Sequence, residues 1–167
     1  MKLRKLCLKD APGMFEWMID PERAQHFSFI PEKVTMENVE EFINKASQFS
    51  SDRHYAIVDE SDEYMGTISL KDINEDFKRA EYAIALRESA SGKGIGYKAT
   101  MAILDIAFNE LGLNRVYLNV FPENKRAIAL YLKCGFKFEG EFRQHVFIRG
   151  EFRNLKWYGI LRDEYEG

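Results

Sequence analysis

The order of hydrophobic and polar residues divides the chain into strand-like and helix-like segments. Apolar residues at every second position predict strands at 3–7, 55–58, 65–70, 79–86, 115–120, 136–142, 145–149 and 153–160. Apolar residues three or four positions apart predict helices at 10–19, 35–49, 95–111 and 124–134, with Asp10 as the cap of the first. Residues 21–30 show neither pattern and are expected to be irregular. Because hairpins and strand–helix–strand crossovers both occur, we expect one mixed α/β sheet with helices on both faces.

Size and composition describe an ordinary globular protein. A chain of 167 residues with 46% hydrophobic residues is expected to form a single domain, residues 1–167. Its net charge of −3 argues against broad attraction to nucleic acid or to an anionic membrane. Cys7 and Cys134 are too few for a zinc site or a disulfide framework, so no metal is expected. The N-terminus is too charged for a signal sequence and no apolar run reaches membrane length, which favours a cytoplasmic location.

A glycine-rich segment joins the strand at 79–86 to the helix that begins near residue 95. Its sequence is Ser91-Gly92-Lys93-Gly94-Ile95-Gly96. A strand, a glycine loop and a helix start together present free backbone N–H groups and the positive end of a helix dipole to a phosphate. The spacing matches neither a nucleotide-binding P-loop nor a dinucleotide fingerprint. The segment therefore indicates a phosphate-bearing ligand, and a flexible linker is the alternative while the loop is considered alone.

A second motif lies further along the chain, in residues 119–136. Asn124 is a good helix N-cap and Gly135 is a typical helix stop. The pattern Asn-x-x-Ala-x-x-x-Tyr-x-x-x-Gly-Phe is met at Asn124, Ala127, Tyr131, Gly135 and Phe136. Together with the glycine loop, this motif resembles the GNAT family of N-acetyltransferases. The segments Ala80-Glu81-Tyr82 and Gly140-Glu141-Phe142 are most similar to the branch that contains ribosomal-protein and spermidine acetyltransferases.

The resemblance implies a fold and a co-substrate. The fold would be a mostly antiparallel, twisted sheet in which the fourth and fifth strands splay apart to hold acetyl-coenzyme A. The family's loop pattern is Gln/Arg-x-x-Gly-x-Gly/Ala, and Ser91 stands here where Gln or Arg is usual. Implied contacts to the coenzyme come from the strand end (Ile84, Ala85, Leu86), the loop (Gly92, Lys93, Gly94, Ile95, Gly96) and the later helix (Asn124, Tyr131, with Lys133 near the adenosine phosphate).

Acetyl transfer to an amine needs a base for the amine and a proton for the leaving thiolate. The resemblance implies that Tyr131 is the general acid; otherwise it is a core aromatic residue. Glu81 is the candidate general base, because it interrupts an apolar strand on the same side as two alanines. Its alternative role is a solvated strand position or an ion-pair partner of Arg79 or Arg115. His26 and a chain of water molecules are the other candidates for the base.

The sequence indicates the identity of the acceptor amine less clearly than it indicates the fold or the coenzyme site. In the family the acceptor pocket is built mainly from segments that correspond here to residues 17–30 and 140–157, and neither shows an acidic excess. We therefore expect a primary amine on a small polar molecule, or a protein N-terminal amine, and rank spermidine below these. A homodimer and a monomer both remain open. Two other functions compete with catalysis: a non-catalytic acyl-coenzyme A sensor and, more distantly, a nucleotide-dependent enzyme.

Overall fold

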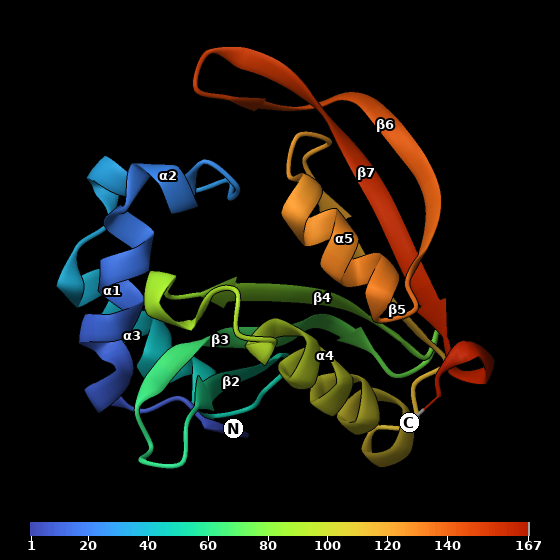
Figure 1. The fold of residues 1–167 in the computed structure, drawn as a ribbon, viewed down its shortest axis with the longest axis horizontal. Helices are drawn as coiled ribbons and strands as arrows, with labels where there is room; N and C mark the ends of the chain where they lie inside the picture. Colours follow the sequence, from blue (N-terminus) through green and yellow to red (C-terminus); the bar gives the residue numbers. More distant parts are fainter. Residues whose placement is uncertain (167) are drawn as a thin grey trace.

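The computed structural model describes residues 1–166 as a seven-stranded twisted sheet with helices on both faces (Figure 1). The strands lie in the order β1-β2-β3-β4-β5-β7-β6, and all neighbours are antiparallel except β4 and β5. Their bounds are Lys2–Lys5, Arg53–Val58, Tyr64–Asn74, Arg79–Leu86, Arg115–Val120, Lys137–Ile148 and Glu151–Leu161 for β1 to β7. The mixed, mostly antiparallel sheet expected from the sequence is confirmed. Gly167, the last residue of the expected domain, lies outside the described residues.

The helices form two layers, one on each face of the sheet. Their bounds are Ala11–Ile19, Pro21–Ala24, Met36–Ala46, Ile95–Asp105 and Lys125–Lys133 for α1 to α5. Ile57 of β2 belongs to the core beneath α4 and α5, whereas its neighbours Ala56 and Val58 belong to the core beneath α1 and α3. This alternation explains why β2 is apolar at consecutive positions. None of the helices within residues 1–166 is long and apolar enough to span a membrane.

The parallel pair β4 and β5 separates along its length. Cα pairing joins only Arg79–Glu81 of β4 to Arg115–Tyr117 of β5, although β4 continues to Leu86 and β5 to Val120. Beyond Glu81 the edge of β4 that faces β5 therefore has no partner strand within the described chain. Backbone N–H and C=O groups on such an edge are available to an extended ligand. The splayed pair expected from the family resemblance is thus present.

Asp10 does not cap α1, contrary to the sequence expectation. Its carboxylate accepts hydrogen bonds from Arg4 at 2.8 Å and from the Cys7 N–H at 2.9 Å, and it makes no side-chain cap bond. Burial alone would raise the pKa of Asp10, but the hydrogen bonds from Arg4 and Cys7 outweigh burial and leave that pKa below its usual range. A buried carboxylate needs a charged partner, and pairing with Arg4 on β1 prevails over capping.

Two other expectations need correction. Residues 21–30 are not wholly irregular, because Asp20 accepts from the Glu22 N–H at 3.0 Å and Pro21 begins the short helix α2. The strands expected at 136–142 and 145–149 are one strand, β6, whose register against β7 shifts between Phe142 and Val146. An irregularity of this kind inserts unpaired residues and interrupts the two-residue period, so the pattern suggests two strands where there is one.

Candidate functional site

A cleft of about 740 Å³ lies where β4 and β5 separate. It is lined on one side by the end of β4, the glycine loop and α5, and on the other by residues after α2 and by the β6–β7 hairpin. Residues more than a hundred positions apart in sequence, such as His26 and Trp157, therefore share one cavity. The two segments expected to border the acceptor, 17–30 and 140–157, both contribute lining residues.

The glycine loop leads directly into the N-terminus of α4. Gly94 is the N-cap residue with φ +74°, no side chain caps the helix, and a Cβ at Gly94 would enter open space. The first N–H groups of a helix have no partner within it, so this loop and helix start can bind an anionic phosphate. Gly96 has a different reason to be glycine: its Cβ would lie 3.1 Å from Leu130, so its absence lets α4 and α5 approach. The loop thus fits a pyrophosphate, although not every glycine in it serves that purpose.

Two arginines that were not expected at this site from the sequence lie beside the glycine loop. Arg23 of α2 donates to the Leu86 carbonyl at 2.9 Å and to Ser91 Oγ at 3.2 Å. Arg126 at the start of α5 lines the cleft, and its Nη2 lies 3.5 Å from the position of a Cβ on Gly92. Lys133, further along α5, lies with its Nζ 5.0 Å from the centroid of the Tyr97 ring. Arg23 lies outside both sequence motifs and Arg126 occupies an unspecified position of the second, so only the fold shows that both lie at the loop.

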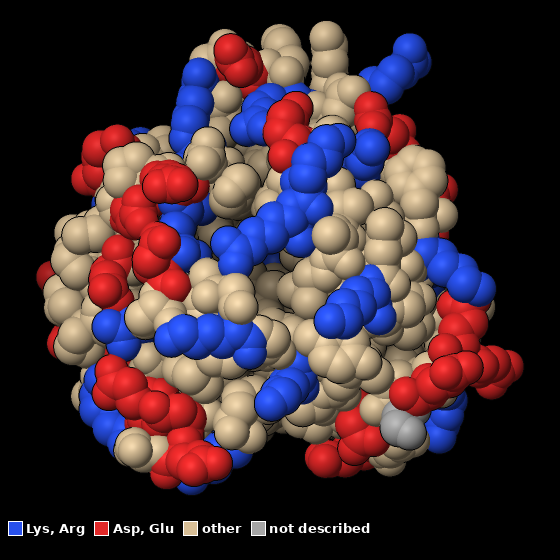
Figure 2. All heavy atoms as spheres, in the orientation of Figure 1, with Lys and Arg blue, Asp and Glu red and all other residues tan. Residues whose placement is uncertain are grey.

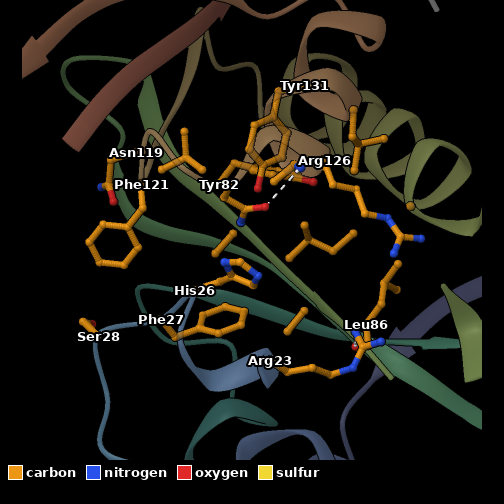
Figure 3. A pocket seen from close by; sticks show the side chains of 18 of the residues that line it. Arg23, His26, Phe27, Ser28, Tyr82, Leu86, Asn119, Phe121, Arg126 and Tyr131 are labelled. Carbon is orange, nitrogen blue, oxygen red and sulfur yellow. Dashed lines mark hydrogen bonds between the residues drawn. The ribbon is translucent and has the colours of Figure 1, made fainter. Parts of the chain in front are cut away.

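Tyr131 projects from α5 with its hydroxyl directed into the cleft (Figure 3). Its ring is buried and meets the Tyr82 ring edge-on, with 5.7 Å between centroids. Burial raises the pKa of Tyr131 above its usual range, and the nearby Cys134 raises it further, so the phenol stays protonated at physiological pH. Asn124 lies about two helical turns before Tyr131, where its Oδ1 accepts from the Ala127 N–H at 3.3 Å and caps α5.

Glu81 lies at the point where β4 and β5 begin to separate, and it lines the cleft. Its Oε1 accepts from Asn119 Nδ2 at 3.2 Å and lies 3.4 Å from Lys71 Nζ. Its side chain is mostly covered, with 19% exposed. The partners considered from the sequence, Arg79 and Arg115, are replaced by Lys71 and Asn119. Lys71 lies opposite Glu81 on β3, and Asn119 lies two residues beyond Tyr117, the residue of β5 that pairs with Glu81.

The acceptor side of the cleft contains two histidines. Burial lowers the pKa of His26, and the charges of Arg153 and Arg23 lower it further, so its imidazole is neutral near pH 7. His145 of β6 also lines the cleft, although no role was expected for it from the sequence. The Nε1 of Trp157 is buried and has no hydrogen-bond partner among the described residues. An N–H group without a partner beside a cleft is consistent with a ligand that supplies the missing acceptor.

Charges of both signs surround this cavity. Lys and Arg side chains lie on several sides of the hollow in the middle of the face that Figure 2 shows. Among the lining residues, Arg23, Lys71, Arg126 and Lys133 are basic and Glu22, Glu81 and Glu88 are acidic. Arg126 lies beside the glycine loop and Lys133 beside Tyr97, the residue after it, where phosphate charge would need compensation. No group of three or more His, Cys, Asp or Glu that could hold a metal ion occurs within residues 1–166.

Comparison with known proteins gives a consistent picture. A sequence model described as an acetyltransferase (GNAT) domain matches residues 1–137. Spermidine N(1)-acetyltransferase of Vibrio cholerae is 31% identical over 131 residues, which cover 78% of this chain and 76% of that protein. A putative ribosomal N-acetyltransferase of Bacillus subtilis is 32% identical over 61% of this chain and 56% of its own length. The crystal structure of the Vibrio cholerae spermidine enzyme with CoA and spermine superposes with a TM-score of 0.90, at 28% identity over 98% of this chain and 96% of that one.

Proposed function

This chain belongs to the GNAT family of acetyl-coenzyme A-dependent N-acetyltransferases, and we propose that Tyr131 and Glu81 carry its proton transfers. In this scheme a primary amine attacks the thioester directly, so that a C–N bond forms and the C–S bond breaks. The observation that carries the proposal is the cleft at the β4–β5 separation, which holds the glycine loop, Tyr131 and Glu81 in one cavity. Acetyl-coenzyme A would lie along Ile84, Ala85 and Leu86, with its pyrophosphate at residues 92–96.

The first proton comes from the amine. An alkyl ammonium with a pKa of about 10.4 is almost entirely protonated near neutral pH, so attack requires a base or a desolvating pocket. Glu81 is the favoured base because its carboxylate lines the cleft and a hydrogen bond from Asn119 fixes its orientation. Lys71 Nζ lies 3.4 Å from the same carboxylate, so Glu81 has an opposite charge beside it while it holds no proton. The neutral imidazole of His26 is the alternative base on the acceptor side.

The second proton goes to the leaving thiolate. In water a thiol with a pKa of about 8.5 is a stronger acid than a phenol with a pKa of about 10, so transfer from tyrosine would be uphill. Burial disfavours both anions, and it raises the pKa of Tyr131 here. A thiolate that forms beside Tyr131 in the same desolvated cavity is destabilised too, which offsets the rise in the pKa of the tyrosine. We therefore assign Tyr131 as the hydrogen-bond donor to the departing sulfur and as the group that protonates it.

For the acceptor, we propose a primary amine on a small molecule. Arg149, in the turn between β6 and β7, donates to the Ala24 carbonyl at 2.9 Å and so ties the hairpin to the end of α2. This bridge limits the width of the acceptor side and favours a slender amine over a folded protein surface. Relatives named for spermidine place polyamines first among the amines to test, above the order expected from the sequence alone. A protein N-terminal amine on an extended segment is the second acceptor class, and a homodimer is the assembly to test.

A thiol-release assay tests this proposal directly. The purified protein is incubated with acetyl-coenzyme A and, in turn, polyamines, amino sugars, amino-acid derivatives and peptides with free N-termini, and products are identified by mass spectrometry. We expect thiol release that depends on the amine, with an acetyl group added to that amine. Coenzyme binding without release on any amine would instead support the non-catalytic sensor, and acetylation of peptides alone would overturn the small-molecule assignment.

A further inference from the structure

Arg23 connects the acceptor side of the cleft to the coenzyme side. It lies on α2, and its guanidinium reaches the end of β4 and the start of the glycine loop, more than sixty residues later in the chain. Nη1 donates to the Leu86 carbonyl at 2.9 Å, and Nη2 donates to Ser91 Oγ at 3.2 Å and lies 3.1 Å from Glu88 Oε2. The side chain is 19% exposed, so these contacts are largely shielded from water. Figure 3 shows Arg23 beside Leu86 at the lower edge of the pocket.

This contact falls at the position where the chain departs from its family's loop pattern. Ser91 occupies the place at which Gln or Arg is usual, and its Oγ donates only a long bond, at 3.4 Å, to the Arg87 carbonyl just after β4. The fork of Arg23 holds Ser91 and Leu86 at the same time, so a guanidinium from another element stands at this point of the loop. A loop fixed in this way before binding loses less conformational entropy when a ligand binds.

We propose that Arg23 is a positioning residue for acetyl-coenzyme A that replaces the long side chain missing at position 91. It acts through Leu86 and Ser91: by holding both, it sets the spacing between the backbone edge of β4 and the glycine loop. The inference rests on the proposed coenzyme site at residues 84–86 and 92–96. It differs from a general stabilising role, because the expected loss lies in coenzyme affinity and a long side chain at position 91 should repair it.

Calorimetric titration of the 167-residue protein with acetyl-coenzyme A tests the inference. Arg23→Met keeps the aliphatic stem and removes the fork, and we expect the Kd to rise about tenfold or more, since hydrogen bonds from charged groups are the stronger ones. Arg23→Lys should give a smaller rise, because one ammonium cannot hold both acceptors in the geometry of the fork. Adding Ser91→Arg to Arg23→Met returns a long cationic side chain to the usual position and should recover most of the lost affinity.

Arg87→Met is the matched control. Arg87 follows Leu86 in the chain and is similarly covered, at 22% exposed, but it pairs with Glu16 and Glu63 and does not line the cleft. We expect this change to lower thermal stability and leave the Kd unchanged. Arg23→Met with wild-type affinity, an equal loss in Arg87→Met, or no recovery in the double variant would each overturn the inference. If Arg23→Met does not fold, Arg23→Lys and Ser91→Ala decide the question by the same titration. A wild-type protein that does not bind the coenzyme would refute the proposed function instead.

Discussion

At the scale of single residues, Tyr64 and Tyr131 show that two buried phenols can have different surroundings. Tyr64 and Tyr131 are similarly buried, with 4% and 7% of their surfaces exposed. Burial raises the pKa of Tyr64 to about 12, and its hydroxyl bonds to Trp17 Nε1 at 3.1 Å and Thr67 Oγ1 at 2.7 Å. Tyr131 directs its hydroxyl into the cleft instead. A hydroxyl bonded within the core contributes to stability, whereas one directed into a reactive cavity is available to a substrate.

Tyr131→Phe is expected to lower kcat by about a hundredfold or more, because it removes a placed proton donor while the ring keeps its packing. The Kd of acetyl-coenzyme A should remain close to the wild-type value. Tyr64→Phe is the control: it removes an equally buried hydroxyl outside the cleft and should cost about 1 kcal/mol of unfolding free energy with kcat unchanged. Steady-state kinetics and thermal unfolding measure both effects. Wild-type turnover in Tyr131→Phe would show that this residue only fills the core.

The pH dependence of turnover distinguishes Glu81 from His26. Glu81→Gln removes the proposed base, so kcat/KM should fall strongly near pH 7 and recover partly above pH ~9, where a growing fraction of an amine with a pKa of about 10.4 is unprotonated. The pKa of His26 lies below its usual range. If His26 were the base, turnover would therefore fall only at acid pH, where its imidazole becomes protonated. We expect His26→Asn to leave the shape of the profile unchanged above pH 7. Equal loss in Glu81→Gln at every pH would contradict the base role.

At the scale of elements, the loop and helix start form the proposed coenzyme site, and two glycines allow a matched test. Gly94 has φ +74° and Gly112 has φ +64°, and a Cβ would meet open space at either position. A glutamate therefore introduces similar backbone strain at both, but only at Gly94 does it place a carboxylate at the anion-binding end of α4. We expect Gly94→Glu to abolish measurable acetyl-coenzyme A binding in calorimetry and Gly112→Glu to leave binding intact. Unchanged binding in Gly94→Glu would remove the pyrophosphate from this loop.

Much of the element order could be predicted from the sequence, because local periodicity and caps determine it. The helix expected at 35–49, which is α3 in the structure, illustrates this. Thr35 and Asn38 cap it reciprocally, and Val39 and Ile43 form its buried face. The π-helical turn Ile106–Glu110, which extends α4 toward Gly112, could not be predicted, since an apolar period of three to four residues does not distinguish it from an α-helix. Arg23, Arg126 and His145 were missed for another reason: their place at the site depends on contacts between distant elements, which leave no local pattern.

At the scale of the whole molecule, the β6–β7 hairpin extends past the rest of the sheet and returns toward α2 (Figure 1). Its turn contains Arg149 with φ +51° and Gly150 with φ +78°, a conformation that suits glycine but is strained for arginine. The Arg149 guanidinium donates to the carbonyls of Ala24 at 2.9 Å and Phe29 at 3.4 Å. These bonds join the two segments that border the acceptor side, so the shape of that side depends on a contact between opposite ends of the chain.

Arg149→Met should therefore weaken the binding of the acceptor and leave the binding of the coenzyme unchanged. The methionine keeps the same backbone strain and loses only the two bonds, so the hairpin is released from the segment after α2. We expect the KM of the acceptor to rise roughly tenfold, the loss that one charged hydrogen bond would cause, while kcat and the Kd of acetyl-coenzyme A change little. Arg143→Met, an exposed position on the same hairpin, is the control and should leave all three unchanged. If Arg149→Met weakened the binding of the coenzyme and left the acceptor KM unchanged, the hairpin would have to be assigned to the coenzyme side. The acceptor would then have to enter from elsewhere.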